Sequence, residues 1–195
     1  MDVLKEVGNI GAGHAATALS RLLDKPVDMK VPKVNLLPLE EVADLVGGAE
    51  QIVMAVFLRV DGDAPGNMFF VVQIESAKSL LRKLVGLDVQ DEEQFSELEL
   101  SALNEIGNIL AGSYLSSLAD FTKLSLSPSV PSLAMDMAGA ILSFGLIQYG
   151  QMGDHALFID TTFLEGNDAV EGNFFFIPDP ESFPIIFHAL GVPLE

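Results

Sequence analysis

Residues 2–23 carry apolar and polar side chains with the period of an amphipathic helix. Asp2, Glu6 and Asn9 are spaced i, i+4 and i+7, so they fall within a stripe roughly 60° wide on the helix surface. The apolar positions on nearly the opposite side are Val3, Leu4, Val7, Ile10 and Ala18. We therefore expect this helix to bury its apolar side and to leave a carboxylate and an amide, one turn apart, facing solvent.

The rest of the chain reads as short strands and helices in a repeated order. After the first helix we expect a strand at 27–31 that is interrupted at Pro32, a short helix at 39–46, hairpin strands at 52–60 and 67–74, and a helix at 76–85. Beyond an acidic linker at 86–96 we expect a helix at 96–121, a strand near 124–135, a helix at 137–149, hairpin strands at 154–164 and 172–177, and a helix at 180–190. Two helix–strand–helix–hairpin–helix units predict an α+β fold around a largely antiparallel sheet.

The polar stripe of the first helix is written a second time, 99 residues later. Ser101, Glu105 and Asn108 have the same spacing, again with isoleucines on the opposite side. An ungapped comparison of residues 1–33 with 100–132 gives ten identities, against roughly two expected from average composition. The chain is therefore predicted to be a single domain of two pseudo-twofold repeats, about 1–86 and 96–195.

A solvated helix face would explain one isolated copy of this stripe. Solvent does not require the same glutamate and asparagine twice, each with a proline at one fixed distance. Pro32 lies 23 residues after Asn9, and Pro131 lies 23 residues after Asn108. The duplication therefore favours a functional surface over an ordinary solvated face.

Three glycines in the first helix also need an explanation, because each weakens a helix. We expect Gly8, Gly11 and Gly13 to allow close packing of the helix on a neighbour. The string GNIGAG is not a phosphate-binding loop: its spacing is not GxGxxG, no strand precedes it, and Leu110 replaces Gly11 in the second copy.

Composition narrows the classes of function. The net charge of −18 argues against nucleic acid or an anionic membrane as a partner. The most apolar run, residues 138–149, is too short to span a bilayer. The first residues lack the positively charged segment that begins a signal peptide, so we expect none. The absence of cysteine makes a reducing cytoplasm the simplest location. Three scattered histidines have no metal-ligand spacing.

The spacing Asp/Ser-x3-Glu-x2-Asn-x22-Pro resembles the signature of the CheC/CheX/FliY phosphatases of bacterial chemotaxis. The residues that fit it are Asp2, Glu6, Asn9 and Pro32 in the first copy, and Ser101, Glu105, Asn108 and Pro131 in the second. The strings KEVGNIGAGHAATALS and SALNEIGNILAGSYLSSLADF carry the same likeness, which extends over essentially the whole chain.

The resemblance implies a hydrolase that acts on the aspartyl phosphate of the response regulator CheY. It assigns Asn9 and Asn108 to orienting the attacking water, and Glu6 and Glu105 to pairing with the active-site lysine of CheY. CheY supplies its own Mg²⁺, so this protein is expected to carry no cofactor. The remaining motif positions are supporting ones: Asp2 and Ser101 flank the site at the start of each helix, and Pro32 and Pro131 shape the strand behind it.

The resemblance also implies a second partner, the receptor deamidase CheD. Residues 137–144 form an apolar, small-residue segment that is the candidate docking element, with an ordinary core helix as the equal alternative. A second class of function stays open as well: a non-enzymatic binding or flagellar-switch module of this family. The glutamate and asparagine in both repeats favour the enzyme.

Overall fold

The computed structural model describes residues 2–31, 33–90, 94–149, 154–165 and 167–192, and it shows the same order of elements in both halves of the chain. The first half contains α1 (Asp2–Leu23), β1 (Asp28–Lys30), β2 (Val34–Pro38), η1 (Leu39–Glu41), α2 (Val42–Leu45), β3 (Ile52–Gly62), β4 (Gly66–Gln73), α3 (Ile74–Leu80) and η2 (Leu81–Val85). The second half contains α4 (Glu97–Thr122), β5 (Leu126–Pro128), β6 (Ser132–Met137), α5 (Ala138–Tyr149), β7 (His155–Glu165), β8 (Asp168–Pro178) and α6 (Ser182–Ala189).

All described strands belong to one antiparallel sheet, and equivalent strands of the two halves lie at equal distances from its centre. The order is β1-β7-β8-β4-β3-β5, with β2 also paired to β7 and β6 also paired to β3. The centre is the β4–β8 pair, where Phe69 lies opposite Phe175. Each half therefore gives its first two strands to the hairpin of the other half. The predicted α+β fold with an antiparallel sheet is confirmed.

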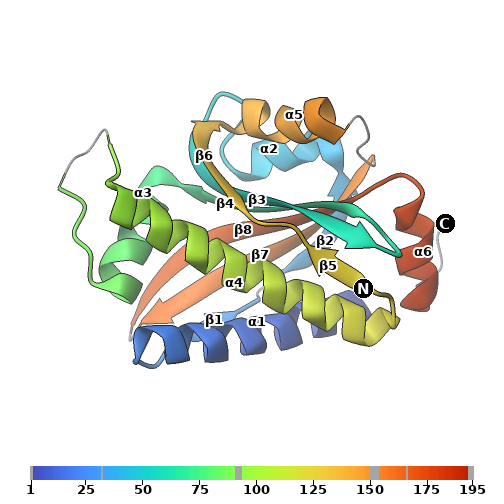
Figure 1. Ribbon diagram of the computed structural model, residues 1–195, viewed down its shortest axis with the longest axis horizontal. Coiled ribbons are helices and arrows are strands. Elements are labelled where there is room, and N and C mark those ends of the chain that lie inside the picture. The colour runs from blue at the N-terminus through green and yellow to red at the C-terminus, as the bar shows by residue number, and fades with distance from the viewer. Residues whose placement is uncertain (1, 32, 91–93, 150–153, 166, 193–195) are drawn as a thin grey trace.

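Helices cover both faces of this sheet (Figure 1). On one face, α1 and α4 lie side by side and pack on a large apolar core together with residues of α3, η2 and α6. On the other face, α2 and α5 cover a smaller core that includes Phe69 and Phe175. Among the described residues, no helix combines the length and the apolar character that crossing a membrane requires.

Two predicted elements between residues 124 and 149 differ from the structure. The strand expected near 124–135 is divided into β5 and β6, because Pro131, which has no backbone N–H to pair, lies in the segment between them. Met137, expected in the following helix, is the last residue of β6 and pairs with Ile52 of β3.

The start of α4 is fixed by a capping box. The Ser96 side chain accepts a hydrogen bond from the Glu99 backbone N–H (3.3 Å), and the Ser96 backbone N–H donates to the Glu99 carboxylate (2.7 Å). These contacts satisfy two backbone groups that would otherwise lack partners at a helix N-terminus. They place Ser101 in the second turn of the helix, Glu105 in the third and Asn108 at the start of the fourth.

Helices α1 and α4 run antiparallel, and side chains of α4 connect them to each other and to the sheet. The Ser117 hydroxyl donates to the Val7 carbonyl of α1 (2.8 Å). Tyr114 lies against Gly11, hydrogen-bonds Thr161 of β7 (2.9 Å) and packs its ring on Phe174. Because Tyr114 is buried in this core, its pKa is raised to about 12.

Candidate functional site

The first Glu–Asn pair lies on the outer side of α1. Glu6 and Asn9 are both exposed, as the helical projection predicts. The buried side of α1 is rotated from the predicted one: Leu4 and Val7 are buried, but Val3 is 36% exposed. The reason is that the core side of α1 also includes small residues and one leucine that the apolar pattern left out. These are Gly8, Gly11, Ala12, Ala15 and Leu19. Asp2 begins α1.

The second pair occupies the equivalent position on α4. Ser101 and Glu105 are exposed, and Asn108 is partly exposed. Ile106 and Gly107, which stand between them in the sequence, are buried against the sheet. Each pair thus stands on the solvent side of a helix whose other side is held by the core, and each is accessible to another macromolecule.

The glycine before each asparagine lets its helix approach the sheet. A Cβ added at Gly107 would lie 2.5 Å from Cβ of Val56 on β3, which is closer than real carbon atoms pack. A Cβ added at Gly8 would lie 3.1 Å from Cγ2 of Val34 on β2. The depth at which Asn9 and Asn108 sit is therefore set by glycine-to-strand contacts directly beneath them. The packing predicted for Gly8 and Gly11 is confirmed, whereas Gly13 has nothing within 4 Å of an added Cβ.

The two pairs are not brought together into one site. Val7 is level with Ser117 along the helix pair, because a hydrogen bond joins them. Glu105 precedes Ser117 by twelve residues, so at 1.5 Å rise per residue the two glutamates are about 20 Å apart along the axis. The structure therefore presents two separate surfaces of the same kind.

Of the two prolines in the motif, Pro131 lies among the residues that the structure describes. Pro131 is partly buried and immediately precedes β6, where Ser132 pairs with Phe57. Pro32 lies outside the described residues, between β1 and β2.

The chemistry open to each pair alone is limited. An asparagine amide donates and accepts hydrogen bonds but is not a base. His14, the nearest histidine in the sequence, is exposed on α1 and lies outside the Glu–Asn stripe. Within the ranges that the structure describes, no group of three or more metal-ligating side chains is found. Such a pair can orient a reactant or complete a site that another protein supplies in part.

Comparison with solved structures defines the class of protein by its fold. FliY from Thermotoga maritima superposes with a TM-score of 0.73 at 20% identity, over 97% of this chain and 94% of that chain. The FliM middle domain from H. pylori gives 0.66 at 11% identity over 96% of each chain. A chain of the CheX–CheY–BeF3–Mg²⁺ complex from Borrelia burgdorferi gives 0.50 at 17% identity, over 87% of this chain and 96% of that one. The chain thus shares the fold of a group of proteins that includes FliY, the FliM middle domain and CheX.

Sequence comparison places the chain within that group. The model of the CheC-like family matches residues 1–36 and 98–135, which include both signature helices. The CheY-P phosphatase CheC of Bacillus subtilis (strain 168) is 46% identical over 198 residues, covering 100% of this chain and 95% of that protein. A putative CheY-P phosphatase CheC1 of Halobacterium salinarum is 23% identical over 97% of this chain and 95% of that protein. The chain belongs to the CheC-like family.

Proposed function

We propose that this protein is a phosphatase that hydrolyses the aspartyl phosphate of the response regulator CheY. The observation that carries the proposal is the duplicated Glu–Asn pair, exposed at equivalent positions of α1 and α4. The name of the Bacillus subtilis relative, CheY-P phosphatase CheC, supports the substrate. The solved complex of CheX with CheY supports a protein partner for this fold.

An aspartyl phosphate is an activated acyl phosphate, so hydrolysis needs mainly one water placed in line with the bond that breaks. The water oxygen bonds to phosphorus, the bond from phosphorus to the aspartate oxygen breaks, and inorganic phosphate leaves while aspartate returns as a carboxylate. The proton that the water loses passes to the phosphate product or to solvent. CheY supplies the Mg²⁺ and the lysine that neutralise the phosphoryl oxygens.

In this mechanism Asn9 and Asn108 enter the regulator's site and hold the water by their amides. Glu6 and Glu105, one turn earlier on the same face, pair with the regulator's lysine and dock the helix. The carboxylate contact exists before and during the reaction, whereas the amide acts mainly on the attacking water. Substituting the asparagines is therefore expected to affect mainly turnover, and substituting the glutamates mainly affinity.

The test is a pair of double variants compared by turnover and by affinity. Asn9→Ala/Asn108→Ala should lower phosphate release from radiolabelled CheY-P by about 10²–10³, the usual loss for a group that acts in the transition state. Its affinity for CheY bound to beryllium fluoride, measured by calorimetry, should be nearly kept. Glu6→Ala/Glu105→Ala should weaken that affinity and lose activity partly for this reason. His14→Ala serves as the control on the same helix.

Two outcomes would contradict the proposal. Normal turnover by the double asparagine variant would refute the mechanism for this chain. Equal loss of affinity in both double variants would refute the division of roles.

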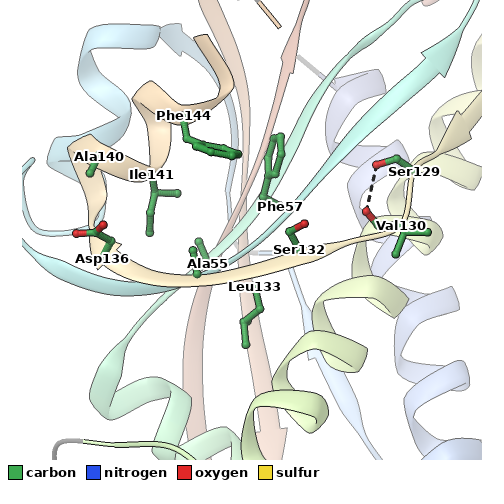
Figure 2. Close-up of a pocket in the computed structure, with 11 residues that line it drawn as sticks. Ala55, Phe57, Ser129, Val130, Ser132, Leu133, Asp136, Ala140, Ile141 and Phe144 are labelled. Carbon is green, nitrogen blue, oxygen red and sulfur yellow. Dashed lines mark hydrogen bonds between the residues drawn. The ribbon is translucent and has the colours of Figure 1, made fainter. Parts of the chain in front are cut away.

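We further propose that α5 docks CheD. Ala138 and Ile141 are buried in the smaller core, but Phe144 is 49% exposed. The Phe144 ring stands edge-on to Phe57, at 5.9 Å between centroids, beside a groove of about 300 Å³ between α5 and β6 (Figure 2). The groove is lined mainly by apolar residues of β3, β6 and α5, and the side chains of Phe57, Ile141 and Phe144 face it. An exposed apolar groove of this kind suits a protein partner.

Phe144→Ala separates docking from the core-helix alternative. If α5 docks CheD, the variant should lose CheD binding in a pull-down while its basal turnover of CheY-P and its melting temperature stay near the wild-type values. Unchanged CheD binding would refute this docking surface.

The second candidate function is a non-enzymatic switch module. It is favoured by one observation, that the FliM middle domain and FliM–FliG complexes share the fold. Phosphate release from CheY-P with and without the protein distinguishes the two, because a binding module would leave the rate unchanged or slow it.

A further inference from the structure

Gly13 and Gly112 are helical glycines that the fold itself does not require. A Cβ added at either position would meet nothing within 4 Å. They differ in this from Gly11 and Gly107, whose added Cβ atoms would lie 2.5 Å from a neighbouring side chain, and from Gly8, whose added Cβ would be in tight contact with Val34. Glycine in a helix interior is less favourable than alanine. A residue type that weakens the helix and fills no packing need calls for a reason outside the folded chain.

The positions of these two glycines point to that reason. Gly13 follows Asn9 by four residues, and Gly112 follows Asn108 by four residues. A four-residue step places each glycine one turn beyond its asparagine, about 6 Å along the axis and on the same face. The same coincidence in both halves ties the open glycine to the Glu–Asn face rather than to one local context.

The surface around Gly13 is open beyond the glycine itself. An open groove begins at Gly13 and continues along α1 past Ala16 and Ser20, and residues 24–29, which lead from α1 into β1, form its other wall. The Thr17 hydroxyl donates back to the Gly13 carbonyl (2.9 Å), so the next polar side chain is held against its own helix. The helix surface beyond Asn9 is thus free of projecting side chains at Gly13 and Thr17, and another chain can approach it.

We propose that Gly13 and Gly112 are contact residues for the phosphorylated regulator, whose main chain beside the aspartyl phosphate packs directly on the helix there. This inference rests on the proposed function, because the glycines extend the face that carries the Glu–Asn pairs. Glycine permits close approach of a backbone from another molecule, since no Cβ holds the partner away. A side chain at these positions would hold the regulator off the helix and withdraw the amide from the phosphoryl site. The effect would be felt in both binding and turnover.

The test adds side chains of increasing size at both glycines. Gly13→Leu/Gly112→Leu should lower kcat/KM for CheY-P by about tenfold or more, with Gly13→Ala/Gly112→Ala showing a smaller loss in the same direction. The melting temperature of the alanine variant should equal or exceed that of the wild type, because alanine favours the helix. His14→Leu, which puts the same side chain on an exposed position outside the stripe, should keep wild-type kinetics.

Each outcome decides between the inference and its alternatives. A folded leucine variant with kcat/KM within twofold of wild type would overturn the contact. So would a lowered melting temperature in the alanine variant, which would show a packing role inside the fold. Wild-type protein that fails to release phosphate from CheY-P would refute the proposed function instead, which keeps the two failures distinguishable.

Discussion

Replacing Gly107 by alanine tests whether the asparagine is positioned by contact between helix and sheet. The new Cβ would lie 2.5 Å from Cβ of Val56, and ordinary carbon contacts need about 3.5–4.0 Å. Val56 cannot yield easily, because it is buried and its strand is paired on both sides, with Phe70 and with Leu133. We therefore expect α4 to move outward by about 1 Å, at an overpacking cost of about 1–3 kcal/mol.

The alanine also favours the helix by about 0.5–1 kcal/mol relative to glycine, so a matched variant is needed. Gly112→Ala makes the same substitution in the same helix where nothing lies within 4 Å. Its free energy of unfolding should rise by that amount. The difference between the two variants in urea titration isolates the overpacking cost, and it should be about 1–3 kcal/mol. Equal stabilities would refute the account of how the helix is seated.

The same displacement of α4 should also lower the rate of CheY-P hydrolysis. In an Asn9→Ala background, where turnover comes from α4, an outward shift of about 1 Å at Asn108 is expected to lower the rate by as much as about 10²-fold. Destabilisation without any loss of turnover would show that Gly107 supports the fold and leaves the position of Asn108 unaffected.

Three further predictions concern the pairs, the metal and the core. Because each half has its own Glu–Asn pair, Asn9→Ala or Asn108→Ala alone should leave measurable phosphate release, and complete loss from one of them would show that the other half is inactive. Protein treated with chelator and desalted before CheY-P and its Mg²⁺ are added should keep its full rate; lost activity, with a tightly bound metal in the untreated protein, would contradict this. Burial raises the pKa of Tyr114 from its usual 10.0 to about 12, so the folded protein holds this proton more tightly than the unfolded chain. The contribution of Tyr114 to the free energy of unfolding should be fully present below pH 10 and should be lost as the pH rises from about 10 to 12. Tyr114→Phe should remove this part of the pH dependence in thermal melts.

Local patterns predicted the two long helices of this fold well, but they did not predict the strand β2 at Val34–Pro38. The first helix was expected at 2–23 and is found there, because its amphipathic period and the Glu–Asn stripe run without interruption. The second was expected at 96–121 and begins at Glu97, because Ser96 is its N-cap. What the patterns did not contain is the pairing of β1 and β2 with β7, since strands far apart in sequence carry no local mark of their partner.

The candidate site was predictable as far as its exposed residues. The outward positions of Glu6, Asn9 and Glu105 follow from the helical projection and are found in the structure. The roles of the motif residues stay predictions. The difference between Gly107, which lies on Val56, and Gly112, which lies in the open, depends on which strand passes beneath each turn. No single helix pattern holds that information.

The exchange of strands between the halves constrains when the chain can fold during its synthesis. β1 pairs with β7, whose residues lie more than a hundred positions later in the chain. β3, the outer strand of the first hairpin, pairs on its other side with β5 and β6 of the second half. When only the first half of the chain has left the ribosome, β1 and β2 therefore lack their partner strand β7. The β3–β4 hairpin is also unpaired along the edge of β3 that later binds β5 and β6. Such edges pair readily with other chains. The nascent protein is therefore most prone to aggregation until β7 and β8 emerge. Because the sheet is complete only then, the two Glu–Asn surfaces reach their final positions together rather than one after the other.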